Sequence, residues 1–198
     1  MNRGKSKILP IVLLAIIAVV TIIIMVSIGR SLLNRGTQEK VVDDSSSRAL
    51  LATEADRSVR MSVRGPIVAN ENFRSYEIEV SPIGRRLTTH KGYLGEIIED
   101  NRLENNNEAY TEFVNALNRA EFTKLAEVSE EIKETEGLCA TGRLYTFEIL
   151  QAQSVVKKTW ASSCRDIPGS FRGDAVLVRD LFQDQIPDGK KLLRDLDI

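Results

Sequence analysis

The sequence predicts an N-terminal transmembrane helix followed by an α+β domain of antiparallel β-hairpins, with about five strands and two main helices packed on one face. Three observations support this. A long uncharged apolar run lies near the N-terminus, several later segments alternate apolar and polar residues, and two segments have the apolar spacing of amphipathic helices. We expect a short tail over 1–7, the transmembrane helix over 8–29, a linker over 30–56, the domain over 57–187 and a C-terminal tail over 188–198.

The apolar run covers residues 8–29 and carries no charge. A helix needs about 20 apolar residues to cross the hydrocarbon core of a bilayer, and it bonds its own backbone polar groups there. A cleaved signal peptide would have an apolar core of about 7–15 residues and a small-residue cleavage site, which the following VSIGRSLL lacks. Lipoprotein anchoring requires a cysteine near the end of the run, and none lies there. The length of the run disfavours a buried core helix. We expect an uncleaved signal anchor.

The charges flanking this run are nearly balanced, because three basic residues precede it within 3–7 and four follow it within 30–48. The higher density of basic residues in the short segment before the run favours a cytoplasmic N-terminus, but only weakly. Four of the 27 Lys and Arg residues, but none of the 28 Asp and Glu residues, lie in 1–30, so the rest of the chain has a net charge of −5. Such an acidic balance disfavours a nucleic-acid binder.

The domain begins with strand patterns. SVRMSVR alternates apolar and polar residues, and so do SYEIEV and RRLTTHKGY on either side of the turn SPIG. With this turn closed by Ser81 and Gly84, three pairs of residues face each other: Ile78 and Leu87, Tyr76 and Thr89, and Glu79 and Arg86. A bulge at the turn would shift this register by one residue.

Two helices are expected. The first covers about 105–120, where Asn105 and Glu108 resemble a capping box and the apolar positions are Tyr110, Phe113, Val114 and Leu117. The second follows Asp174, which can cap it, and stops at Ile186-Pro187; its apolar side holds Ala175, Val178, Leu181 and Phe182. SRALLATEA in the linker can form one or two helical turns, and DGKKLLRDLDI is a tail or a short docking helix.

The only two cysteines, Cys139 and Cys164, bound a second predicted hairpin with strands over 143–150 and 154–163. With the turn at Gln151-Ala152, Cys139 faces Cys164. In this register both cysteines share the apolar face with Tyr145, Phe147, Ile149, Val156 and Trp160. Facing residues have Cα atoms about 4.5–5.5 Å apart, within disulfide range. A four-residue turn would make the cysteines diagonal neighbours, still near bonding range.

A disulfide persists where the compartment is oxidising, so the cysteine pair favours a domain outside the cytoplasm. Two buried free thiols in a cytoplasmic domain are the alternative. Zinc binding is disfavoured because two cysteines and a single histidine fall short of the usual ligand set.

No catalytic or nucleotide-binding motif occurs, and we expect no catalytic, cofactor or metal site. The single histidine, His90, is expected on the outer strand face with Glu77, Glu79 and Arg86, a possible polar surface site. A histidine beside a carboxylate can act as a general base, although an exposed strand histidine is usually only solvated. The run EIIEDNRLENNNE is rich in oxygen ligands but lacks the spacing of a calcium loop, so helix capping and solubility explain it better.

Two further groups of side chains have both a functional and a structural interpretation. Six basic residues of the first strands could form a strip for an anionic envelope polymer or lipid headgroups, but separate solvated faces are the default: Arg57, Arg60, Arg64, Arg85, Arg86 and Lys91. Tyr145, Phe147 and Trp160 could line a ligand site, but we expect them to pack in the core near the cysteines.

Several segments carry a resemblance: EIEVSPIGRRLTTHKGY, NEAYTEFVNALNRAEFTK, the paired cysteines with Trp160, and GSFRGDAVLVRDLFQDQIPD. Over about residues 70–187 the chain resembles a group of small, single-anchor exported proteins of Saccharibacteria-type bacteria, whose function is unknown. The resemblance implies a bacterial envelope setting and transfers no catalytic residue.

These observations predict a single-pass membrane protein with a cytoplasmic N-terminus and a non-enzymatic binding or interaction module outside the cytoplasm. The expected partners are the lipid bilayer, through residues 8–29, and an envelope or surface protein or an anionic polymer, but no nucleic acid. One alternative is an envelope hydrolase with a site near His90. The other is a membrane-tethered adaptor facing the cytoplasm.

Overall fold

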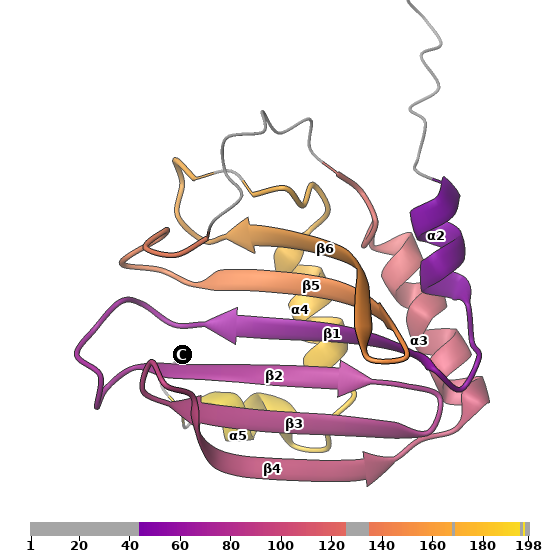
Figure 1. The fold of residues 1–198 in the computed structure, drawn as a ribbon, viewed down its shortest axis with the longest axis horizontal. Coiled ribbons are helices and arrows are strands. Elements are labelled where there is room, and N and C mark those ends of the chain that lie inside the picture. Colours follow the sequence, from indigo (N-terminus) through magenta and orange to yellow (C-terminus); the bar gives the residue numbers. More distant parts are fainter. Residues whose placement is uncertain (1–43, 126–134, 168, 195, 197–198) are drawn as a thin grey trace, which may run out of the picture. The chain divides into compact units, whose positions relative to one another are not determined.

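A computed structural model describes residues 44–125, 135–167, 169–194 and 196, which belong to one unit, Val42–Ile198. Within them, six strands form one antiparallel sheet in the spatial order β4-β3-β2-β1-β5-β6 (Figure 1). The strands are β1 (Arg57–Arg64), β2 (Arg74–Val80), β3 (Gly84–Lys91), β4 (Glu96–Glu104), β5 (Leu144–Gln151) and β6 (Ser154–Ser162). The predicted α+β class is confirmed, with six strands instead of about five.

The additional strand, β4, lies at one edge of the sheet within the run that we had assigned to helix capping and solubility. Two adjacent isoleucines, Ile97 and Ile98, interrupt any alternation of apolar and polar residues there, and both are about half exposed. The pairing of β4 with β3 also shifts register between Thr89 and His90, as at a β-bulge. A charged, irregular edge strand gives little periodic signal, which is why the sequence did not predict it.

The register of the first hairpin is confirmed. Strands β2 and β3 pair Tyr76 with Thr89, Ile78 with Leu87 and Glu79 with Arg86. The backbone N–H of Ser81 donates to the carbonyl of Gly84 at 2.8 Å, and the Gly84 N–H donates to the Ser81 hydroxyl at 3.0 Å. These local bonds fix the turn and therefore the pairing of the two strands.

The predicted register of the second hairpin is wrong. Phe147 pairs with Thr159 rather than Val156, because the turn residues are Ala152 and Gln153 and the register shifts again between Ile149 and Leu150. Both turn residues have positive φ, 47° and 68°. The slip moves two side chains: Trp160 pairs with Thr146 and so lies on the opposite face from Phe147, and Val156 is 48% exposed.

The disulfide is confirmed despite that slip. Cys139 and Cys164 are bonded, with Cα atoms 5.5 Å apart. Both residues lie outside the strands, one before β5 and the other after β6, so the bond closes the open end of the hairpin. Gly142 packs tightly here, since a Cβ at this position would lie 2.7 Å from the Cys139 sulfur. The bond therefore does not require the cysteines to face each other within the strands.

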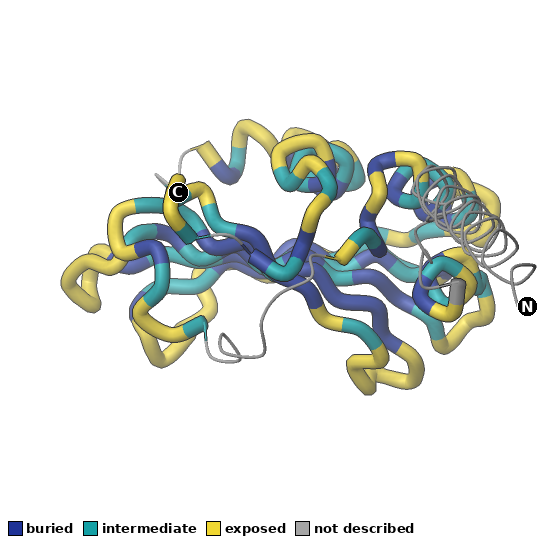
Figure 2. The backbone as a smooth tube through the Cα atoms, turned by 90° about the horizontal axis from the view of Figure 1, so that it is seen from above, coloured by how far each residue is buried: buried dark blue, intermediate teal, exposed yellow. Residues whose placement is uncertain are grey.

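Four helices are found among the described residues, and they lie on one side of the sheet (Figures 1 and 2). They are α2 (Asp44–Leu51), α3 (Asn107–Arg119), α4 (Ala175–Gln183) and α5 (Gly189–Arg194). Asp174 caps α4 as predicted, accepting bonds from the N–H groups of residues 176 and 177. The cap of α3 is Asn106 instead of Asn105, whose amide donates to the Ser81 carbonyl at 2.7 Å.

The core fills the space between the helices and the sheet, and Figure 2 shows long stretches of the central strands coloured as buried. The apolar positions predicted for the two main helices point into it. Strand residues of the core that are at most 3% exposed include Val59, Met61, Tyr76, Ile78, Leu87, Tyr145, Phe147 and Ile149. Removing such side chains from water is the main favourable term in folding.

The folded unit extends beyond the predicted domain, 57–187, at both ends. Helix α2 lies within the expected linker and places Leu50, 0% exposed, in the core. Helix α5 lies within the expected tail and buries Leu193 at 4% exposure. Each helix contributes apolar surface to the core, which is why these segments are not simple tethers.

The predicted transmembrane helix over 8–29, the tail over 1–7 and the first part of the linker lie outside the described residues. Among the helices that the structure does describe, none combines the length and apolar character needed to cross a bilayer.

Candidate anion-binding site

The sheet has a helix face, packed against the helices, and an open face. The possible polar site falls on the open face, because Glu77, Glu79 and Arg86 lie at strand positions whose neighbours point into the core. The two glutamates converge on Arg60 of β1: its Nη2 lies 3.0 Å from Glu79 Oε2, and its Nε lies 3.5 Å from Glu77 Oε1. Glu148 of β5 also reaches Arg60, at 3.4 Å.

Arg86 does not join this cluster through a described ion pair. Its guanidinium pairs with Asp100 of β4, which also accepts a bond from Arg102. The hydrogen bond from Arg86 is the main cause that lowers the pKa of Asp100 to about 2. The predicted polar site is thus divided into two separate groups, and within each group the charges form ion pairs with one another.

His90 lies beside a separate hollow of about 310 Å³ on the open face, which Ser62, Ser75 and Glu77 also line. The His90 Nδ1 atom lies 3.2 Å from the Gly95 carbonyl oxygen. Glu77 accepts a bond from the Ser62 hydroxyl at 3.3 Å. The structure therefore brings His90 and Glu77 to one hollow, without an ion pair between them among the described contacts.

The six basic residues of the first strands do not form one strip. Arg85 points to the helix side, where it donates to the carbonyls of Glu104 and Gln185. Arg64 donates to two loop carbonyls, and Lys91 pairs with Glu96 at 3.4 Å. Their charges are satisfied separately, which agrees with the default interpretation.

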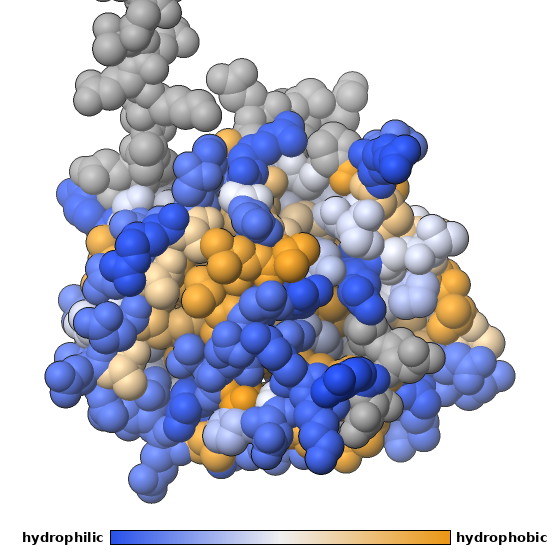
Figure 3. Space-filling view, turned by 180° about the vertical axis from the view of Figure 1, so that it is seen from behind, coloured by the Kyte–Doolittle hydropathy of each residue, from blue (hydrophilic) through white to orange (hydrophobic). Residues whose placement is uncertain are grey.

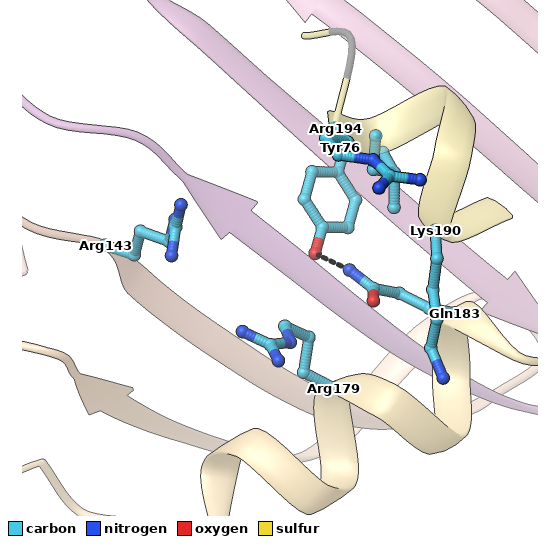
Figure 4. Close-up of a pocket in the computed structure, with 7 residues that line it drawn as sticks. Tyr76, Arg143, Arg179, Gln183, Lys190 and Arg194 are labelled. Atoms are coloured by element: carbon cyan, nitrogen blue, oxygen red, sulfur yellow. Dashed lines mark hydrogen bonds between the residues drawn. The ribbon is translucent and has the colours of Figure 1, made fainter. Parts of the chain in front are cut away.

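The helix face holds a pocket that the sequence did not predict. Its volume is about 200 Å³, and it lies between strand β2, the start of β5 and helices α4 and α5 (Figure 4). Its lining residues, which define what we call the cationic pocket, are Tyr76, Arg143, Arg179, Gln183, Lys190, Leu193 and Arg194. Figure 3 shows this side of the molecule, where hydrophilic areas adjoin an apolar one. Four of the seven lining residues are basic.

Tyr76 lies at the base of the cationic pocket and is only 3% exposed. Gln183 of α4 donates a hydrogen bond of 3.0 Å to its hydroxyl oxygen. Burial is the main cause that raises the pKa of Tyr76 to about 12, and the positive charges of Arg179 and Arg143 oppose that rise. The hydroxyl therefore stays protonated at neutral pH and lies within electrostatic reach of two guanidinium groups.

Two of the four cations have carboxylate partners on the helices. Arg179 pairs with Asp180 at 2.7 Å, and Lys190 pairs with Asp184 at 2.6 Å. The hydrogen bond to Asp184 is the main cause that raises the pKa of Lys190, while Arg179 opposes it. The charges of the two helices thus interact across the pocket.

The other two cations, Arg143 and Arg194, have no side-chain hydrogen bond or ion pair to any residue that the structure describes. Arg143 precedes β5, and its side chain is partly buried; Arg194 ends α5 and is exposed. Guanidinium groups without partners around a tyrosine hydroxyl can bind an anionic oxygen group through charge-assisted hydrogen bonds.

Part of this site had a signal in the sequence. Arg179 and Gln183 are four residues apart on α4, and Lys190 and Arg194 are four apart on α5, so each pair lies on one side of its helix. Nothing local indicated that both sides would meet Tyr76.

Searches against protein-family models and against curated proteins find no match to this chain. The fold and the pocket define its class: an α+β domain with a six-stranded antiparallel sheet, helices on one face and a cationic pocket between them.

Proposed function

We propose that this chain is a single-pass membrane protein whose folded domain lies outside the cytoplasm and binds an anionic component of the cell envelope without performing chemistry on it. The cationic pocket carries this proposal. Three arginines and one lysine line the pocket together with one buried hydroxyl, and such a concentration of positive charge attracts anionic groups and raises their local concentration. The partner is an anionic polymer or the anionic side chains of a surface protein.

Other observations support the location. The bond between Cys139 and Cys164 is stable in an oxidising compartment and rare in the cytoplasm. The uncharged run over 8–29 is long enough for a membrane-spanning helix. The resemblance to exported single-anchor proteins supports the same setting.

Binding can be tested with the full-length protein in detergent micelles and two anionic polymers of different chemistry, dextran sulfate and polyglutamate. We expect both to bind, and the double variant Arg143→Gln/Arg179→Gln to lose at least tenfold in affinity. Lys191→Gln is the matched control, because it removes a charge from α5 but does not line the pocket. Equal losses in the two variants would mean that general surface charge binds the polymers, and the proposal would be wrong.

The orientation can be tested with Leu94→Cys, since Leu94 is 99% exposed at the tip of the β3–β4 hairpin. A membrane-impermeant maleimide should label this cysteine on intact cells. Labelling only after lysis would instead support the cytoplasm-facing adaptor.

An envelope hydrolase is a second candidate, favoured by the hollow of about 310 Å³ that brings Ser62, Ser75, Glu77 and His90 together. A histidine there could act as a general base towards a hydroxyl. His90→Ala should then abolish the phenotype that the intact gene supports. A variant that keeps every phenotype would eliminate this candidate.

A further inference from the structure

We propose that the cationic pocket binds a doubly charged terminal phosphate group in preference to singly charged phosphodiesters and carboxylates. This inference rests on the proposed anion-binding function and specifies its ligand. The phosphate could belong to a soluble phosphomonoester, to the end of an envelope polymer or to a lipid headgroup. All of these present the same three terminal oxygens.

The charge of the pocket carries the first step. Asp180 and Asp184 offset two of the four cations, through the ion pairs to Arg179 and Lys190. Arg143 and Arg194 retain their charge without a partner in the described part of the chain. Counted over the residues that the structure describes, the pocket therefore has a net charge of about +2, which one dianion neutralises and a monoanion does not.

The hydrogen-bonding groups carry the second step. Because Gln183 donates to the oxygen of Tyr76, the tyrosine hydroxyl keeps its own proton for another acceptor. Guanidinium and ammonium groups only donate. The free hydrogen-bonding capacity of Tyr76, Arg143 and Arg194 therefore consists mainly of donors, and it matches a ligand end that only accepts, as the oxygens of a terminal phosphate dianion do.

The size of the pocket carries the third step. Its volume of about 200 Å³ is below the roughly 300–1,000 Å³ of sites for drug-sized ligands, so it admits one small group. Tyr76 is buried at its base, while Lys190 and Arg194 are exposed at its rim. The phosphate would enter towards Tyr76, and the remainder of the ligand would extend into solvent.

Calorimetric titrations of the full-length protein in detergent test this selectivity with four probes: glycerol phosphate, sulfate, dimethyl phosphate and acetate. At pH 7.5 we expect the two dianions to bind at least tenfold more tightly than the two monoanions. Arg143→Gln and Arg194→Gln should each weaken glycerol phosphate binding at least tenfold, and Lys191→Gln should not. Circular dichroism verifies that each variant is folded.

A pH change separates the charge of the ligand from that of the protein. The second ionisation of a phosphomonoester has a pKa of about 6, so its dianion falls to about one tenth at pH 5. We expect the affinity for glycerol phosphate to fall about tenfold between pH 7.5 and pH 5, with sulfate, still a dianion, as the control. An equal fall for sulfate would show that the protein's own charge had changed, and would overturn dianion selection.

The remaining outcomes are also distinct. Equal binding of dimethyl phosphate or acetate would overturn the selectivity but leave an anion-binding function. If no anion binds, or if the arginine variants change nothing, the proposed function itself fails. Adding phosphatidic acid or phosphatidylglycerol to the micelles identifies the source: tighter binding of phosphatidic acid than of glycerol phosphate indicates a lipid headgroup, and the reverse indicates a soluble or polymeric phosphate.

Discussion

Gln183 and Tyr76 are joined by a hydrogen bond of 3.0 Å, although they lie 107 positions apart in the sequence. The bond connects helix α4 to strand β2 at the base of the cationic pocket. It fixes the tyrosine oxygen as an acceptor towards the helix, so its proton can be donated into the pocket. The site therefore depends on the packing of α4 against the sheet.

We predict that Gln183→Glu weakens anion binding more than tenfold while the domain stays folded. Glutamate has nearly the same shape as glutamine, but its negative charge would occupy the pocket and compete with the ligand for the guanidinium groups. Calorimetric titration with sulfate measures the change. Gln185→Glu is the control, because Gln185 donates to the Leu181 carbonyl and does not line the pocket. Similar losses in both variants would contradict a local effect.

Removing the disulfide should lower the free energy of unfolding by about 3.5 kcal/mol, because the bond between Cys139 and Cys164 restricts a loop with a sequence separation of 25 in the unfolded chain. Urea denaturation of the double serine variant measures this. A reductant should destabilise the natural protein similarly and leave the serine variant unchanged. An unchanged midpoint on reduction would contradict the prediction.

Helix α2 allows a test of whether the folded domain begins before the first strand. Leu50→Ala should destabilise the domain by about 2–5 kcal/mol, because the side chain is 0% exposed in the core. The neighbouring Leu51 is 38% exposed, so Leu51→Ala should cost about 0.5 kcal/mol or less. Denaturant unfolding of the two variants compares them directly. If both changes have equally small effects, α2 is not part of the cooperative unit.

The ion pair of Asp100 with Arg86 gives a pH-dependent prediction. The pKa of Asp100 is lowered to about 2 in the folded domain, against about 3.9 in an unfolded chain. The pair therefore stabilises the fold fully above about pH 4–5, and this contribution is lost as the pH falls towards 2. Asp100→Asn should lower the melting temperature at pH 7, and the difference from the natural protein should vanish near pH 2.

Glu99→Gln is the control for this experiment. It removes a carboxylate from the same strand, and this carboxylate has no ion pair among the described contacts. A difference between Asp100→Asn and the natural protein that stays constant down to pH 2 would show that the charge of Asp100 is not the cause.

The first hairpin could be predicted in detail because its information is local: strict alternation along both strands and a turn fixed by Ser81 and Gly84. The second could not. Its turn places Ala152 and Gln153 at positive φ, where Asn or Gly would be usual, and a register shift follows at Ile149. The sequence carries no local sign of either feature, so the predicted register was wrong although the disulfide was correct.

The cationic pocket was missed for a different physical reason. The spacing of Arg179 with Gln183 and of Lys190 with Arg194 puts each pair on one side of a helix. Which side meets Tyr76 depends on how α4 and α5 pack on the sheet. That packing is decided by buried contacts between residues far apart in the sequence. The local pattern identifies Phe182 as a residue of the apolar side of α4, but it does not specify which core residues Phe182 contacts.

The two edge strands of the sheet, β4 and β6, affect how neighbouring molecules behave when they are densely packed. Main-chain groups along β4 could template another strand, but five of its nine residues are charged: Glu96, Glu99, Asp100, Arg102 and Glu104. At β6, Ser170 and Phe171 occupy the backbone N–H and carbonyl of Trp160. Two copies aligned along β4 would bring mostly acidic side chains together. Neighbouring molecules should therefore repel one another instead of polymerising into a continuous sheet, even where they are densely packed.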